Sequence, residues 1–239
     1  MNILAIGNSF SEDATRYLKK IAEADNIDVT VVGLYIGGCP LSLHYQNIKE
    51  DNRAYGFQFN GEDTGIFVSI KEAVLSRKWD YITVQQVSHE SVNYATYQPY
   101  LNDVVAFVRE LSPDSKIVVH QTWAYEEGSE RLCQELKYQN QRDMFEDLKS
   151  AYDSAYEEIG ADMLIPSGEL FQEMIKRGIK VHRDTFHASF GLGRYALGLL
   201  WYKMLTGNKV SGNTFSKFDE PVSGDDVKAV KEIVDGMRE

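Results

Sequence analysis

The sequence has 239 residues, of which 26% are charged, and its formal net charge is −11. A protein that binds nucleic acid or an anionic membrane needs clustered Lys and Arg, and no such cluster occurs along the chain, so we expect neither partner. The two cysteines, Cys39 and Cys133, are too few for a disulfide framework and lack the paired spacing of a zinc site. They predict free thiols in a reducing compartment, with a single disulfide between them as the open alternative.

The chain opens on an apolar run that predicts a core strand, without a basic and apolar leader ahead of it. We therefore expect a cytoplasmic protein, or an exported one from which a signal peptide has been removed. The most apolar segment, residues 195–205, is too short for a transmembrane helix and contains Lys203.

Residues 1–13 predict a strand, a tight turn at Gly7 and the start of a helix. This arrangement places Ser9 at the carboxyl end of a strand, where ligands bind in open α/β sheets. Backbone amides at such a turn hold an oxyanion as readily as a phosphate. On this stretch alone, the simpler interpretation is that Ser9 or Ser11 only caps the helix.

The rest of the chain alternates between apolar strands and amphipathic helices. Further strands are predicted at residues 28–35, 80–86, 116–123 and 162–166, and helices at 13–24, 41–50, 69–78, 101–111, 168–177, 189–205 and after 224. The helical period of residues 127–158 predicts one or two helices. Residues 55–60 and 65–70, joined around Asn60-Gly61, predict a small hairpin inserted into the alternation.

This pattern predicts the class of fold. No linker, repeat or low-complexity tract interrupts the sequence, which favours a single domain over residues 1–239. Five strands that alternate with helices predict an α/β fold with a doubly wound, mostly parallel sheet in the flavodoxin-like order.

Several strands are followed by residues suited to a binding site. After the second strand, two glycines, Gly37 and Gly38, let the backbone come close to a ligand. After the third and fourth strands come the residues that we predict to contact substrate, namely Gln85, Ser88, His89, Gln121 and Trp123. This rim is more polar than a lipid substrate would favour. The aromatic residues Trp123, Tyr125 and Tyr94 suit either stacking on a sugar ring or packing in the core.

Near the far end of the chain, Asp184-Thr185-Phe186-His187 contains a base and a group to orient it. The short spacing lets the Asp184 carboxylate reach one imidazole nitrogen of His187 and fix its tautomer, while the other nitrogen faces a nucleophile. Because this loop follows the fifth strand, we expect it at the same sheet edge as Ser9.

Two other interpretations of this loop stay open. In the first interpretation, Asp184 is only a helix cap and His187 is a buried structural histidine, which is the commoner role of a lone histidine. Alternatively, His182, Asp184 and His187 would bind a metal ion, but no further His or carboxylate cluster of matching spacing supports them. We therefore predict neither a metal site nor a cofactor.

Taken together, Gly7-Asn8-Ser9-Phe10-Ser11, a glycine after the second strand, a polar end of the third and Asp-x-x-His resemble the SGNH/GDSL hydrolase superfamily. The match spans nearly the whole chain in the right order, and it resembles an uncharacterised branch with a Gly-Asn-Ser-Phe-Ser first block. The resemblance implies a serine esterase of flavodoxin-like fold, with Ser9 as nucleophile, His187 as base and Asp184 as its partner. It also implies that the backbone amides of Ser9 and Gly38 form two parts of an oxyanion hole.

The sequence departs from the superfamily pattern at two places. Asn8 stands where the first block usually has Asp, which is not the catalytic acid. The third block usually supplies an Asn side chain as the last oxyanion donor, and here Gln86 or Gln85 would replace it. Loss of one such donor lowers turnover by about 10²–10³.

The sequence thus predicts a serine hydrolase acting on carboxylic esters, with acetyl groups on carbohydrate as the leading substrate. A small-molecule or carbohydrate ester is the expected partner, and the oligomeric state is not predicted. Two alternatives are a non-catalytic ligand-binding domain on the same scaffold and a metal-dependent phosphoesterase.

Overall fold

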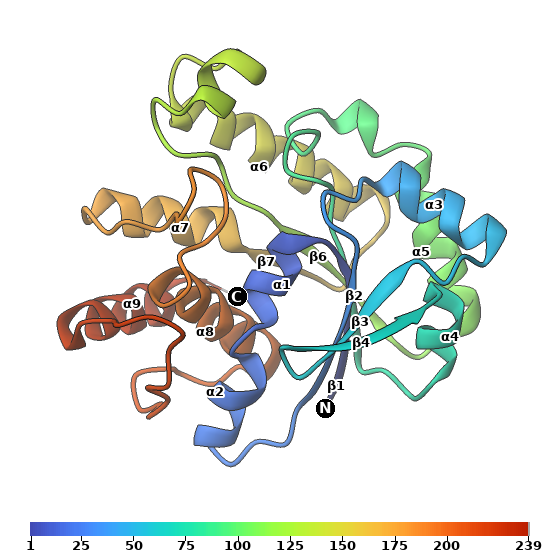
Figure 1. Ribbon diagram of the computed structural model, residues 1–239, viewed down its shortest axis with the longest axis horizontal. Coiled ribbons are helices and arrows are strands. Elements are labelled where there is room, and N and C mark those ends of the chain that lie inside the picture. Colours follow the sequence, from blue (N-terminus) through green and yellow to red (C-terminus); the bar gives the residue numbers. More distant parts are fainter. Residues whose placement is uncertain (239) are drawn as a thin grey trace.

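A mixed β-sheet runs through the middle of the protein (Figure 1). In the computed structural model, which describes residues 1–238, the strand order is β4-β3-β2-β1-β5-β6-β7. The parallel strands are β1 (Asn2–Gly7), β2 (Thr30–Tyr35), β5 (Tyr81–Val84), β6 (Lys116–Gln121) and β7 (Met163–Pro166). Counted alone, they follow the order 2-1-3-4-5, which confirms the predicted doubly wound, flavodoxin-like sheet.

The predicted hairpin is present and extends this sheet. Its strands, β3 (Tyr55–Phe59) and β4 (Glu62–Val68), pair with each other in antiparallel fashion. Strand β3 also pairs with β2, so the hairpin forms one edge of the main sheet. The turn at Asn60-Gly61 has φ of 52° and 83°, which this dipeptide adopts readily.

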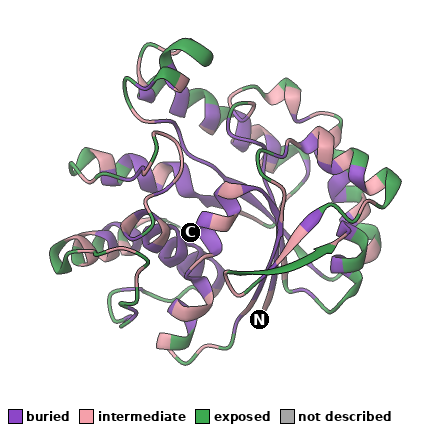
Figure 2. Ribbon diagram, in the orientation of Figure 1, coloured by how far each residue is buried: buried purple, intermediate pink, exposed green. Residues whose placement is uncertain are grey.

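Helices cover both faces of the sheet (Figure 1). On one face lie α1 (Ser9–Thr15), α2 (Leu18–Ala24), α7 (Ser167–Lys176), α8 (Leu192–Thr206) and α9 (Gly224–Gly236). On the other lie α3 (Leu41–Glu50), α4 (Ile70–Leu75), α5 (Tyr100–Leu111) and most of the buried side of α6 (Gln141–Glu158). Because side chains alternate along a strand, Ile3 and Ala5 enter one core and Leu4 and Ile6 the other. Both faces of the central strands are therefore buried (Figure 2).

One predicted helix differs from the structure. The helix predicted at 13–24 is two helices, because α1 begins at Ser9 and the chain bends at Arg16 and Tyr17. The Tyr17 side chain is buried there, with its hydroxyl donating to the Phe190 carbonyl at 2.7 Å. The long helical region at 127–158 consists of a short π-helical turn (Arg131–Glu135) and α6, and a 3₁₀ turn (Tyr94–Thr96) lies in the loop after β5.

Helix α8 is the most apolar helix segment and is buried along nearly its whole length. It packs closely on α2 because Gly198 has no side chain. A Cβ at this position would come within 2.8 Å of the Ile21 side chain. None of the helices within residues 1–238 is long and apolar enough to cross a membrane.

Both cysteines are free, as predicted. Cys39 is buried and Cys133 is exposed. Burial raises the pKa of the Cys39 thiol to about 12, so Cys39 stays protonated beside the Gly38 turn.

Candidate active site

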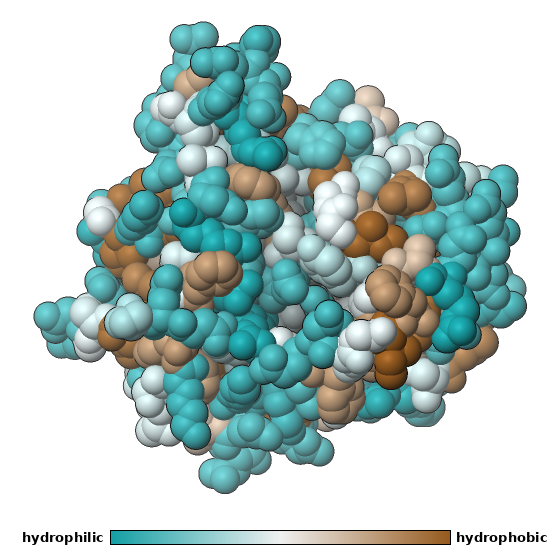
Figure 3. All heavy atoms as spheres, in the orientation of Figure 1, coloured by the Kyte–Doolittle hydropathy of each residue, from teal (hydrophilic) through white to brown (hydrophobic). Residues whose placement is uncertain are grey.

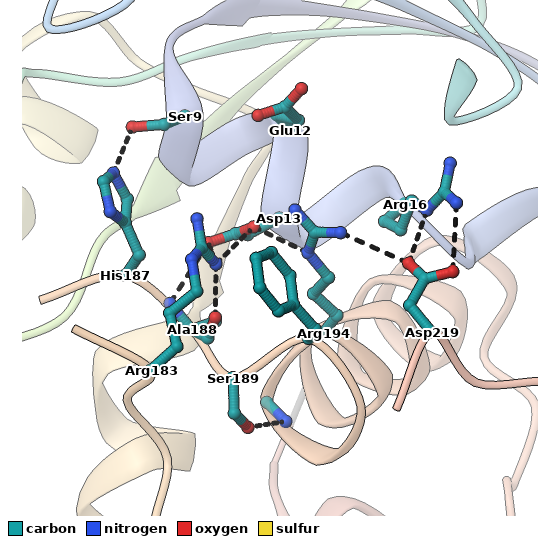
Figure 4. A network of polar contacts seen from close by, with 12 residues as sticks. Ser9, Glu12, Asp13, Arg16, Arg183, His187, Ala188, Ser189, Arg194 and Asp219 are labelled. Atoms are coloured by element: carbon teal, nitrogen blue, oxygen red, sulfur yellow. Dashed lines mark hydrogen bonds and ion pairs between the residues drawn. The ribbon is translucent and has the colours of Figure 1, made fainter. Parts of the chain in front are cut away.

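The structure brings Ser9, His187 and Asp184 into direct contact, although Ser9 lies 178 positions before His187. The Ser9 Oγ is 2.8 Å from Nε2 of His187, and Nδ1 of His187 is 2.8 Å from Oδ2 of Asp184 (Figure 4 shows the Ser9–His187 pair). Since a carboxylate only accepts, Nδ1 carries the proton and Nε2 is free to accept from the serine hydroxyl. This geometry is that of a nucleophile, a general base and its orienting group.

Asp184 also anchors the backbone of its loop. Its second oxygen, Oδ1, accepts a 2.9 Å hydrogen bond from the His187 amide. Burial raises the pKa of Asp184. The side-chain and backbone hydrogen bonds from His187 together lower it by more, so the pKa lies below its ordinary value. Asp184 therefore remains ionised at neutral pH and holds the imidazole in one tautomer.

The turn that presents Ser9 depends on the residues around it. A Cβ at Gly7 would lie 2.5 Å from the Ser11 Oγ, so only glycine lets α1 start this close to β1. Asn8 caps α1 by accepting from the Phe10 amide at 3.1 Å. Its Nδ2 donates to the Cys39 carbonyl at 3.3 Å and so joins this turn to the Gly38 turn.

Gln85 supports this turn through buried hydrogen bonds. The prediction that Gln85 contacts substrate is therefore wrong. Its Nε2 donates to the Asn8 side chain at 2.8 Å, and its Oε1 accepts from His120 Nδ1 at 2.8 Å. The other nitrogen of His120 accepts from the Ser167 hydroxyl at 3.1 Å. Of these residues, only Asn8 lines the cavity that lies beside Ser9. Burial lowers the pKa of His120 to about 3, so the imidazole is neutral.

Ser9 and Gly38, whose backbone amides are the predicted oxyanion donors, lie at the same cavity. Both residues line that cavity, and Gly38 has a φ of 62°, a left-handed conformation with no atom near its missing Cβ. Within residues 1–238, neither amide donates a hydrogen bond to another residue. The geometry therefore fits their predicted use as oxyanion donors.

Gln86 does not supply a third donor, which corrects that prediction. Its side chain is fully buried, and Nε2 donates to the carbonyl and hydroxyl of Thr96, each at 3.2 Å. Its Oε1 accepts from the amides of Leu41 and Val87, each at 2.9 Å. Gln86 therefore ties the loop after β5 to the start of α3.

The cavity beside Ser9 has a volume of about 440 Å³, which suits a small ligand. Two of the predicted substrate contacts, Ser88 and His89, line it. Two others do not, which corrects their prediction: Gln121 accepts from the Glu169 amide, and Trp123 stacks on Phe10 with ring centres 4.3 Å apart. Both Gln121 and Trp123 are fully buried.

Other lining residues were not singled out as substrate contacts from the sequence. Tyr125, considered for sugar stacking, lines the cavity and bonds the Ser88 hydroxyl at 2.9 Å, whereas Tyr94 does not line it. The Arg131 guanidinium lies over the Phe186 ring at 4.1 Å, and both line the cavity. The position of Phe186 inside Asp-x-x-His is the one signal that could have identified it.

The residues of the metal alternative do not converge. His182 is buried and its Nε2 donates to the Ala124 carbonyl at 3.0 Å, away from Asp184 and His187. In the part of the chain that the structure describes, no group of three or more His, Cys, Asp or Glu side chains is placed to hold a metal ion. The metal-dependent phosphoesterase alternative therefore has no support from the geometry.

A family model described as "Domain of unknown function (DUF4886)" matches residues 2–233. The chain belongs to the DUF4886 family. A crystal structure of a DUF4886 protein from Bacteroides uniformis is similar to it with a TM-score of 0.92 and 33% identity, over 98% of this chain and 93% of that one. No curated protein matches the sequence.

More distant structures show that this DUF4886 chain shares its fold with SGNH hydrolases. A protein from Slackia heliotrinireducens, provisionally described as an SGNH hydrolase, has a TM-score of 0.61 at 22% identity, over 86% of this chain and 98% of that one. An acetylxylan esterase from Geobacillus stearothermophilus has a TM-score of 0.55 at 15% identity, over 85% and 91%. At these identities the likeness concerns the fold alone.

Proposed function

We propose that this protein is a serine hydrolase that cleaves carboxylic esters. The observation that carries the proposal is the unbroken chain of contacts from the Ser9 hydroxyl through His187 to Asp184, with both hydrogen bonds at 2.8 Å. The fold that this chain shares with SGNH hydrolases adds support.

In the proposed reaction, the Ser9 Oγ attacks the ester carbonyl carbon while Nε2 of His187 takes the serine proton. The amides of Ser9 and Gly38 hold the negative oxygen of the tetrahedral intermediate. His187 then protonates the departing alcohol, which leaves an acyl group on Ser9. A water molecule gives its proton to His187, attacks the acyl group, releases the acid and restores the Ser9 hydroxyl.

The substrate we propose is an acetyl ester of a carbohydrate. One of the similar structures is an acetylxylan esterase. The cavity also combines hydroxyl, imidazole and aromatic side chains, from Ser88, His89 and Tyr125, beside the nucleophile. Such a surface suits a ligand that has both hydroxyl groups and an apolar ring face.

A mutational cycle tests the shared chemical step. Ser9→Ala and His187→Ala should each lower turnover of p-nitrophenyl acetate by a similar factor, at least about 10³, and the double variant should lose little more. Losses that multiply in the double variant would contradict a common step.

Covalent labelling gives a second readout. A fluorophosphonate should modify Ser9, located by mass spectrometry, and Ser9→Ala should abolish labelling although Ser11 remains two residues away. Ser11 is the matched control because it is buried and its hydroxyl donates to the Asn8 carbonyl. A protein that neither reacts with the probe nor hydrolyses esters would instead fit the non-catalytic alternative.

A further inference from the structure

A second cavity, of about 390 Å³, lies beside the first, against the β3–β4 hairpin. Three residues, Glu12, Tyr35 and Gly37, border both cavities. Glu12 comes from α1, only three residues after Ser9. The space next to the nucleophile therefore continues over the sheet edge that the hairpin forms, beyond the part that an acetyl group would occupy.

Two aromatic rings wall this second cavity. Tyr35 on β2 lies opposite Gly56 on β3, which in turn lies opposite Phe67 on β4, so all three positions share one face of the sheet. Gly56 has no side chain, which leaves the space between the two rings unfilled. Phe67 is 58% exposed, and hydrophobic residues stand out among polar ones over the hairpin in Figure 3. An exposed aromatic ring beside a cavity offers a large apolar face on which the ring of a ligand can pack.

The polar lining of this cavity is neutral or acidic. Gln58 donates to Glu12 at 2.7 Å, and Asp63 adds a second carboxylate. Among the described residues that line the cavity there is no Lys, Arg or His. Carboxylates accept strong hydrogen bonds from hydroxyl groups and repel anions. The lining therefore disfavours anions and suits a ligand that is rich in hydroxyl groups.

The Tyr35 hydroxyl adds a donor at the border of the two cavities. This hydroxyl makes no hydrogen bond to another described residue. Gly37 has no side chain to cover the hydroxyl, whereas a Cβ there would lie 3.3 Å from it. Burial, and then the nearby charges of Glu12 and Asp13, raise the pKa of Tyr35, so its hydroxyl stays protonated.

We propose that this second cavity, lined by Glu12, Tyr35, Gly56, Gln58, Asp63 and Phe67, is a binding site for a neutral sugar ring of an oligosaccharide ester. The bound ring is the neighbour of the sugar whose acetyl group reaches Ser9, and it lies between the Tyr35 and Phe67 rings. This inference deepens the proposed esterase function and rests on it for the identity of the scissile group.

Direct binding tests the site without any catalysis. Xylotriose, cellotriose and maltotriose, which carry no ester, are titrated into the wild-type protein in a calorimeter, and at least one should bind. Gly56→Phe should weaken that binding at least tenfold, because the new ring fills the space between Tyr35 and Phe67. The substitution fits the strand, since a Cβ at Gly56 meets its nearest atom at 3.6 Å.

Two further variants separate the site from the hairpin fold. Phe67→Ala should also weaken binding, whereas Ile66→Ala should not. Ile66 is the matched control because it is 54% exposed on the adjacent position of β4 and pairs with Phe57 on the opposite face. Equal affinity of wild type and Gly56→Phe, or no binding of any trisaccharide, would overturn the proposal.

Kinetics distinguishes this proposal from the proposed function. For acetylated xylotriose, Gly56→Phe should lower kcat/KM at least tenfold, while p-nitrophenyl acetate turnover stays within twofold of wild type. A protein that hydrolyses p-nitrophenyl acetate but binds no trisaccharide would refute the sugar site alone. One that binds trisaccharides but hydrolyses no ester would support the site and refute the esterase.

Discussion

A single amide side chain, that of Asn8, joins the two turns from which the candidate oxyanion donors come. Its oxygen accepts from Phe10 in the Ser9 turn and from Gln85 below it, and its nitrogen donates to the Cys39 carbonyl next to Gly38. An Asp at this position has no hydrogen to donate to that carbonyl when ionised. Asn8 therefore suits this arrangement better than the Asp that the SGNH first block usually has.

Gln86 should contribute to stability rather than directly to turnover. In Gln86→Ala the buried amides of Leu41 and Val87 lose their acceptor, and each unpaired donor costs about 1–3 kcal/mol. Urea unfolding should therefore show a loss of a few kcal/mol. Gln86→Glu keeps the acceptor oxygen but puts a buried carboxylate where the amide donated to the Thr96 carbonyl, so it should lose stability as well. Unchanged stability with a hundredfold lower turnover would instead indicate an oxyanion donor.

The residues of the candidate triad could be found from the sequence, but several neighbours could not. Ser9, Asp184 and His187 occupy local patterns at the two ends of the chain, and the structure brings them into contact. The prediction of substrate contacts is wrong for Gln85 and Gln121 because a polar residue at a strand end can face either the cavity or the interior. The buried chain from Asn8 through Gln85 to His120 links distant strands, and no local pattern reveals it.

At the scale of elements, a buried carboxylate joins helix α1 to the loop before α8. Asp13 is fully buried, accepts from Arg183 at 2.8 and 3.0 Å and from Arg194 at 2.7 Å, and accepts from the Ala188 amide at 3.1 Å (Figure 4). Arg183 and Ala188 flank the segment from Asp184 to His187. The same helix that presents Ser9 therefore holds the loop that presents His187.

Asp13→Asn should destabilise the protein by about 3–5 kcal/mol, because it leaves two largely buried arginines without their shared anion. At a temperature where the variant is still folded, the rate at which a fluorophosphonate labels Ser9 should fall at least tenfold. Chemical unfolding and labelling kinetics measure the two effects.

The matched control for this change is Asp219→Asn. Asp219 holds Arg16 and Arg194 at the outer end of the same network, where its side chain is 31% exposed (Figure 4). A more solvated ion pair contributes about 1 kcal/mol or less, so this variant should keep both stability and labelling. If the two variants behaved alike, Asp13 would have no special part in holding the His187 loop.

The sequence predicted most elements but not how they join. Apolar periodicity located all five parallel strands, because residues buried on both faces of a sheet form continuous apolar runs. It did not show the bend between α1 and α2, since Tyr17 fits the apolar face of one continuous helix and only its bonds to Phe190 and Asp219 explain the bend. Nor could it show that β3 pairs with β2, because pairing across a sheet depends on residues far apart in the chain.

At the scale of the whole molecule, three histidines are buried in different parts of the fold. Burial lowers the pKa of His44 to about 4, of His120 to about 3 and of His182 to about 4. His44 lies on α3, His120 on β6 and His182 between α7 and α8. All three are therefore neutral in the folded protein at pH values where an unfolded chain would protonate them.

This difference predicts that stability falls as the pH is lowered from about 6.5 to about 4.5. Below about 6.5 the unfolded chain binds a proton at each histidine that the folded protein does not bind, so the free energy of unfolding decreases. The loss should approach about 1.4 kcal/mol per pH unit for each histidine. Carboxylates with a lowered pKa, such as Asp219, contribute only near and below about pH 4, so this window reports the histidines.

Urea unfolding at half-unit steps of pH measures this slope, and a non-titrating variant assigns it. His44→Gln should be less stable at pH 7, because the Tyr55 hydroxyl loses its 2.8 Å partner. Its pH dependence should nevertheless be shallower by about one proton, since one of the three buried histidines no longer titrates on unfolding. A slope equal to that of wild type would show that His44 gains its proton as readily in the folded protein as in the unfolded chain.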